Sequence, residues 1–188
     1  MHRTIEFYYD VLSPYAYLCF CRLPGLVKRS GAAMLLKPVS LPRLLEQSGN
    51  PPPLSVAAKA DYLRRDTAEL ARYYGIPFEW PALHPQRTGR AMTVLSTLGE
   101  AERMELSRVL FEAMWIEGRD LGDPEVLETL VGSELLAAAE TPQARELLQQ
   151  GTLELIAKGG FGVPSLVVDD QLFFGNDRLF LVERALNG

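Results

Sequence analysis

The sequence is poor in the residues from which redox and metal centres are built. Its 188 residues include two cysteines and two histidines. Cys19 and Cys21 are two positions apart in an expected helix, so they point to different faces and should not form a disulfide with each other. A structural zinc site needs about four ligands, which these spacings do not supply. We therefore expect reduced cysteines that serve mainly in packing, as in a cytoplasmic protein, and no metal centre.

Long apolar runs and an excess of one charge are also missing. No apolar stretch approaches the roughly 20 residues of a membrane span, and residues 1–4 lead directly into an expected strand without a signal-peptide core. The 19 basic and 24 acidic residues give a net charge of −5 and are interleaved. This pattern predicts neither a nucleic-acid partner nor an anionic membrane surface. The 47% hydrophobic content is enough for one core, in one domain or in one domain with an insertion.

Strand patterns occupy the two ends of the chain, and helical patterns fill the middle. The strands are expected at residues 4–10, 33–39, 165–168 and 171–174. The helices are expected at residues 15–30, 54–75, 152–158 and 177–187, and in several pieces over 87–151. A βαβ unit first and a ββα unit last predict an α/β, thioredoxin-like fold with a large all-helical insertion. We place the thioredoxin-like domain at 1–41 and 152–188 and the helical insertion domain at 42–151.

The turn Ser13-Pro14 joins the first expected strand to the first expected helix. Proline favours the first helical position, so Ser13 is expected to be the N-cap. Its hydroxyl then lies beside unpaired N–H groups at the positive end of the helix dipole, where an anion is stabilised. A thioredoxin-type fold has a reactive Cys-x-x-Cys pair here, whereas this chain has Ser13-Pro14-Tyr15-Ala16. Disulfide exchange by a protein thiolate is therefore excluded at this site.

The economical inference is that a bound thiol cofactor supplies the thiolate. The hydroxyl of Ser13, together with the helix N-terminus, would lower the pKa of that thiol. The alternative is that Ser13 is only a helix cap.

Val163-Pro164 follows a glycine-rich turn and precedes an expected strand. A cis bond here would direct the backbone N–H and C=O of Val163 toward the Ser13 turn. Those groups would be free to pair with an extended peptide ligand. The plainer alternative is an ordinary turn proline.

Asn176 and Asp177 open the last expected helix. A helix N-terminus can hold a carboxylate and Asp177 an ammonium group, so an amino-acid zwitterion fits both. Asn50, on a proline-rich loop, and Lys59, on the following helix, are further binding candidates. The alternatives are a capped surface helix for the first pair and a solvated lysine for Lys59.

Aromatic side chains are the remaining candidates for a pocket wall. Tyr15, Tyr17, Trp80 and Trp115 are suitable in size, although aromatics at helical spacing more often belong to a core.

Taken together, these motifs resemble the 2-hydroxychromene-2-carboxylate isomerase family. That family is related to the kappa-class glutathione transferases, within the DsbA-like branch of the thioredoxin fold. The matching blocks follow in order over nearly the whole chain: residues 8–18, 49–52, 59, 115–121, 161–165 and 174–179.

The resemblance implies a cytoplasmic, homodimeric, glutathione-dependent enzyme that acts on a small aromatic carboxylate in aromatic degradation. It assigns Ser13 to stabilising the glutathione thiolate. It assigns binding of glutathione to Asn50 and Lys59 at the glycyl end, to Val163 and the cis proline Pro164 along the backbone, and to Asn176 and Asp177 at the γ-glutamyl end. Arg87-Thr88 stand where the family often has an asparagine before its helix, which puts an asparagine contact there in doubt.

The implied reaction is a reversible thiolate addition, followed by bond rotation and elimination, which regenerates glutathione. Two alternatives remain. One is a kappa-like glutathione transferase or peroxidase that consumes glutathione, and the other is a non-catalytic module that binds glutathione or peptides. A disulfide oxidoreductase is opposed by Ser13 and Ala16.

Overall fold

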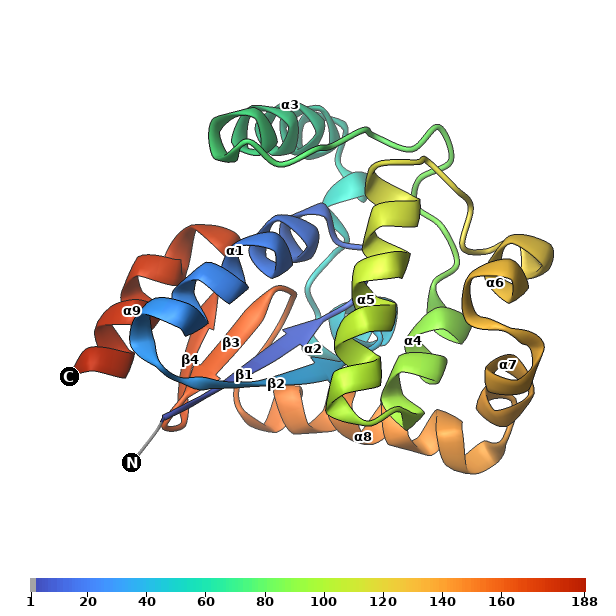
Figure 1. Ribbon diagram of the computed structural model, residues 1–188. Coiled ribbons are helices and arrows are strands. Elements are labelled where there is room, and N and C mark those ends of the chain that lie inside the picture. The colour runs from blue at the N-terminus through green and yellow to red at the C-terminus, as the bar shows by residue number, and fades with distance from the viewer. Residues whose placement is uncertain (1–2) are drawn as a thin grey trace.

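A four-stranded sheet with helices on both of its faces forms the centre of the fold in the computed structural model, which describes residues 3–188 (Figure 1). Its order is β2-β1-β3-β4. The strands are β1 (Thr4–Tyr9), β2 (Ala33–Pro38), β3 (Ser165–Val168) and β4 (Gln171–Phe174). β1 and β2 are parallel, whereas β3 is antiparallel to both β1 and β4. This mixed sheet confirms the predicted α/β, thioredoxin-like fold.

The helices include one after β1, one after β4 and a long insertion between β2 and β3. The flanking helices are α1 (Pro14–Ser30) and α9 (Leu179–Asn187), the latter preceded by a 3₁₀ turn, η2 (Asn176–Arg178). The insertion contains α2 (Leu41–Ser48), η1 (Pro53–Ser55), α3 (Ala57–Tyr74), α4 (Gly89–Thr97), α5 (Glu100–Trp115), α6 (Pro124–Val131), α7 (Ser133–Ala139) and α8 (Pro142–Ala157). No helix among residues 3–188 is both long and apolar enough to cross a membrane.

The sheet separates two apolar clusters because alternate side chains of β1 point to opposite faces. Ile5, Phe7 and Tyr9 belong to the larger cluster, which α1, α5 and α9 cover. Tyr8 belongs to a smaller cluster that includes Leu44 of α2 and Leu155 of α8. Figure 1 shows α8 on the side of the sheet away from α1 and α9.

The larger cluster is continuous from the sheet into the insertion. It includes Met92 of α4 and the fully buried Phe111 and Trp115 of α5, together with Phe7 of β1. Burying each such side chain stabilises the fold by roughly 1.5–3 kcal/mol. The helical layer and the sheet therefore stabilise each other.

Two expectations about the helices are wrong. α2 was not expected, although Pro42 near its start and Gly49 at its end are common helix-boundary residues. Residues 152–158 are not a separate helix, because α8 runs through Gly151 without interruption. The proposed domain boundary at 151/152 therefore falls inside a helix, and the division into two domains stays a proposal.

Asp169 and Asp170 form the tight β3–β4 turn with positive φ angles of 47° and 64°. Two local predictions are confirmed. The Val163-Pro164 bond is cis. Both cysteines are free, Cys19 buried and Cys21 exposed.

Candidate functional site

A cavity of about 650 Å³ lies at the N-terminal end of α1. Its walls come from the β1–α1 turn, the loop after α2, the first turns of α3 and the segment before β3. It brings together five residues predicted from the sequence: Ser13, Tyr15, Asn50, Lys59 and Val163. The volume is in the usual range for a small-molecule site.

Ser13 is the N-cap of α1, as predicted. Its Oγ accepts a hydrogen bond from the backbone N–H of Ala16 at 3.2 Å and donates one to the carbonyl of Val163 at 3.3 Å. The residue is 5% exposed. The hydroxyl therefore lies at the positive end of the α1 dipole, next to the residue that precedes the cis proline.

Asp10 fixes the turn that carries Ser13, and sequence reasoning missed it. This buried carboxylate accepts hydrogen bonds from the N–H of Leu12 (3.0 Å), the N–H of Leu41 (2.9 Å) and the hydroxyl of Thr88 (2.9 Å). Burial raises the pKa of Asp10, while the three hydrogen bonds act in the opposite direction. These contacts fasten the β1–α1 turn to α2 and to the residue before α4.

Val163 presents two backbone groups next to Ser13. Its carbonyl accepts the Ser13 hydrogen bond, and its N–H has no acceptor among residues 3–188. Pro164 is anchored from the other side, because its carbonyl accepts a hydrogen bond from the N–H of Gly175 at 2.9 Å. A free N–H at the edge of a cavity is the group that an extended peptide ligand needs.

Asn50 and Lys59 lie at another part of the wall. The amide Nδ2 of Asn50 donates to the carbonyl of Phe161 at 2.9 Å, which joins the proline-rich loop to the segment before β3. Lys59 is exposed, and within the described chain its ammonium group has no ion-pair partner. It is therefore available to a carboxylate.

Asn176 and Asp177 are not part of the cavity wall. The side chain of Asn176 is 4% exposed, and its Oδ1 is buried without a hydrogen-bond donor among residues 3–188. Asp177 forms an ion pair with Arg178 at 2.8 Å. Its charge also contributes to raising the pKa of Tyr15, so Asp177 is near the residue that follows Ser13-Pro14.

Tyr15 lines the cavity, but its hydroxyl is already engaged. It donates to Oδ2 of Asp66 on α3 at 2.6 Å. Burial first, and then this carboxylate, raise the pKa of Tyr15 far above its ordinary value. Tyr15 therefore contributes a neutral wall and is not a proton donor to a ligand.

The other three aromatic candidates belong to the core. Tyr17 donates its hydroxyl to the carbonyl of Pro77 at 2.6 Å, and Trp80 packs at 5.6 Å from Trp115 between ring centroids. The indole N–H of Trp115 donates to the carbonyl of Val11 at 2.9 Å. Trp115 therefore supports the backbone two residues before Ser13.

His84 also lines the cavity and was not predicted. It lies on the segment between α3 and α4, where no periodic pattern marks individual residues. The one sequence signal for His84 is that the chain contains only two histidines, so each is a candidate for a functional role.

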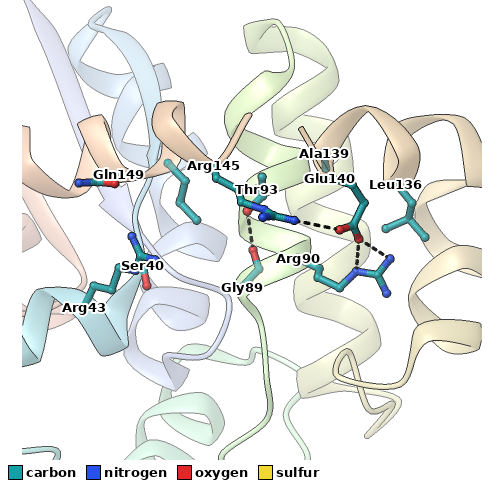
Figure 2. A pocket seen from close by; sticks show the side chains of 11 residues that line it. Ser40, Arg43, Gly89, Arg90, Thr93, Leu136, Ala139, Glu140, Arg145 and Gln149 are labelled. Atoms are coloured by element: carbon teal, nitrogen blue, oxygen red, sulfur yellow. Dashed lines mark hydrogen bonds and ion pairs between the residues drawn. The ribbon is translucent and has the colours of Figure 1, made fainter. Parts of the chain in front are cut away.

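A second, smaller cavity of about 300 Å³ lies between α2, α4, α7 and α8 and holds none of the predicted residues. Figure 2 shows Glu140 at its edge between two arginines. Glu140 pairs with Arg90 at 2.7 Å and with Arg145 at 3.2 Å. These pairs join α4, α7 and α8.

The chain is similar to known proteins over nearly its whole length. The DSBA-like thioredoxin domain family matches residues 4–187. The 2-hydroxychromene-2-carboxylate isomerase of Pseudomonas putida is 34% identical over 97% of this chain and 93% of its own. Human glutathione S-transferase kappa 1 is 30% identical over 98% of this chain and 91% of its own.

A solved structure of a 2-hydroxychromene-2-carboxylate isomerase superposes with a TM-score of 0.86 at 33% identity. The match covers 98% of this chain and 94% of that one. The chain therefore belongs to the DSBA-like thioredoxin family, and within it to the group of 2-hydroxychromene-2-carboxylate isomerases that is related to the kappa-class glutathione transferases.

Proposed function

We propose that this protein is a glutathione-dependent isomerase that interconverts 2-hydroxychromene-2-carboxylate and trans-o-hydroxybenzylidenepyruvate. The observation that carries the proposal is the hydroxyl of Ser13, which caps α1 at the cavity wall and contacts the carbonyl of Val163 at 3.3 Å. Neither residue of a Cys-x-x-Cys pair is present there, so the reactive thiol has to come from the ligand.

The free polar groups of this region match the parts of glutathione. The N–H of Val163 suits a peptide carbonyl, and the ammonium group of Lys59 suits the glycyl carboxylate. The exposed carboxylate of Asp177 suits the γ-glutamyl ammonium group, and Asn176 beside it would support that end of the ligand. Asn50 would hold the glycyl end beside Lys59, and Pro164 would fix the orientation of Val163.

Ser13 then has a defined part in the reaction. When bound, glutathione supplies a thiolate that adds reversibly to an electrophilic carbon conjugated to a carbonyl group. With glutathione bound, Ser13 would donate its hydroxyl proton to the sulfur instead of to the Val163 carbonyl and, with the first N–H groups of α1, would favour the anion. Apolar side chains of the wall would displace water from the bound ligands, which would strengthen these interactions.

Product analysis tests the proposal. Spectral conversion of 2-hydroxychromene-2-carboxylate that requires glutathione but leaves the total thiol unchanged supports the isomerase. Absence of conversion at saturating glutathione contradicts it.

The kappa-like transferase or peroxidase is the second candidate, and the 30% identity to human glutathione S-transferase kappa 1 favours it. Loss of free thiol with a chlorinated aromatic or a peroxide would identify that activity. A non-catalytic module is the third candidate, in which glutathione binds by calorimetry but neither reaction is accelerated.

The family relationship also supports a cytoplasmic homodimer with a small aromatic carboxylate as substrate. Light scattering coupled to gel filtration tests the dimer, and a monomer at all concentrations contradicts it.

A further inference from the structure

His84 has a nitrogen whose situation the packing of the protein does not explain. Its Nδ1 is buried and has no hydrogen-bond partner among residues 3–188. The imidazole packs against two indoles, with its ring centroid 4.9 Å from that of Trp80 and 5.2 Å from that of Trp115. A buried, unsatisfied polar atom in a native structure calls for a functional or structural reason.

The other nitrogen of His84 is free to act on a ligand. Nε2 also lacks a hydrogen bond to the described residues, and it is not buried as Nδ1 is. The residue lines the same 650 Å³ cavity as Ser13 and Val163. An orphaned lone pair on Nδ1 is less costly than an orphaned N–H. The favoured tautomer therefore has its proton on Nε2, where it can be donated.

The surroundings keep the ring uncharged. Burial first, and then the charge of Arg64 on α3, lower the pKa of His84 to about 4. The guanidinium of Arg64 lies over the ring of Trp80, at 5.6 Å from its centroid. At neutral pH the imidazole is consequently a neutral hydrogen-bond donor in a mostly apolar wall.

We propose that His84 contacts the aromatic oxo-acid substrate directly, donating Nε2–H to its carbonyl or carboxylate oxygen. A neutral donor fits an oxygen that gains negative charge during the reaction, because it stabilises that charge without losing its own proton. The polar groups assigned to glutathione belong to the β1–α1 turn, the α2–α3 region and the ends of β3 and β4. His84 belongs to the α3–α4 segment, which supplies none of these groups, so it is assigned to the aromatic substrate.

Kinetics of two variants provide the first test, which depends on the isomerase proposal. His84→Phe keeps an aromatic ring for Trp80 and Trp115 but removes the donor. We expect kcat/KM for the aromatic substrate to fall by about tenfold, with the KM for glutathione unchanged. His84→Gln restores an N–H and should recover most of the loss. An equal loss in both variants, or a changed KM for glutathione, overturns the assignment.

A binding experiment on the wild-type protein is independent of any activity. The two histidines give two imidazole Cε1–H signals in the NMR spectrum, and His2→Gln assigns them. We expect millimolar o-hydroxycinnamate, an aromatic carboxylate, to shift the His84 signal, and S-methylglutathione to leave it in place. An unmoved signal with o-hydroxycinnamate, or a shift with S-methylglutathione alone, overturns the proposal. A protein without isomerase activity whose His84 signal still responds to o-hydroxycinnamate refutes the proposed reaction but not the contact.

Discussion

Replacing Ser13 with alanine separates a helix cap from a group that acts on a thiol. The substitution removes two contacts of Oγ, the bond from the Ala16 N–H at 3.2 Å and the bond to the Val163 carbonyl at 3.3 Å. Loss of an N-cap side chain costs about 1 kcal/mol in free energy of unfolding. For a chain of this length, that lowers the melting temperature by about 2–4 °C.

The catalytic loss should be larger than the loss of stability. Removing one donor that stabilises a developing anion costs about 10²- to 10³-fold in kcat, or roughly 2.7–4 kcal/mol. We therefore expect Ser13→Ala to reduce kcat by about 10²-fold or more. The pKa of bound glutathione, followed by the ultraviolet absorbance of the thiolate, should rise.

Thr141 offers a matched control at the start of α8. Its Oγ1 accepts from the N–H of Ala144, also at 3.2 Å, and it also precedes a proline. Thr141→Ala should lose a similar free energy of unfolding and keep its activity. If Ser13→Ala retains wild-type kcat, or loses no more activity than Thr141→Ala, Ser13 is only a cap and the reasoning fails.

Three other substitutions test the binding of glutathione, the pH dependence of stability and the packing of α8. Asp177→Ala should raise the KM for glutathione far more than it lowers kcat, since it removes a charge assigned to the γ-glutamyl ammonium group; unchanged glutathione saturation would contradict this. The pKa of His84 is about 4 in the folded state, against 6.5 as its ordinary value, so protonation favours the unfolded state. The free energy of unfolding should therefore be highest above pH 6.5 and should fall as the pH drops from 6.5 toward 4. Between pH 7 and pH 5, denaturant titrations should show a larger decrease in the free energy of unfolding for wild type than for His84→Phe. Equal decreases would contradict the lowered pKa of His84. Gly151→Ala should lower the melting temperature, because a Cβ would meet the carbonyl of Pro38 at 2.8 Å, whereas the control Gly89→Ala meets nothing within 4 Å; equal melting temperatures would refute the clash.

The parts of the site that were predictable are those with a local physical cause. Ser13 was identified as an N-cap because proline follows it, and Thr141, which also precedes a proline, caps α8 in the same way. Four strands and their thioredoxin-like arrangement followed from strand patterns at the two ends of the chain. Such features depend on residues that are close together in the sequence, so composition and spacing are enough to predict them.

The parts that were missed depend on distant neighbours. Asp10 is important because its carboxylate accepts hydrogen bonds from Leu41 and Thr88. Both residues are distant in the sequence and are brought next to Asp10 only by the fold. His84 is placed by its packing against Trp80 and Trp115, and nothing in its own segment indicates a cavity. α2 has only eight residues, too few for a clear helical period, and its formation depends on packing against α8.

The core that the sheet shares with α4 and α5 has a consequence for any attempt to shorten this protein. A minimal version made by joining β2 directly to β3 would leave the inner faces of Ile5, Phe7 and Tyr9 without their cover from α5. It would also remove Trp115, whose indole holds the Val11 carbonyl beside the Ser13 turn. The excised sheet should therefore aggregate instead of forming a small binding module. The intact chain should unfold in a single cooperative transition, with the glutathione site and the helical layer melting together.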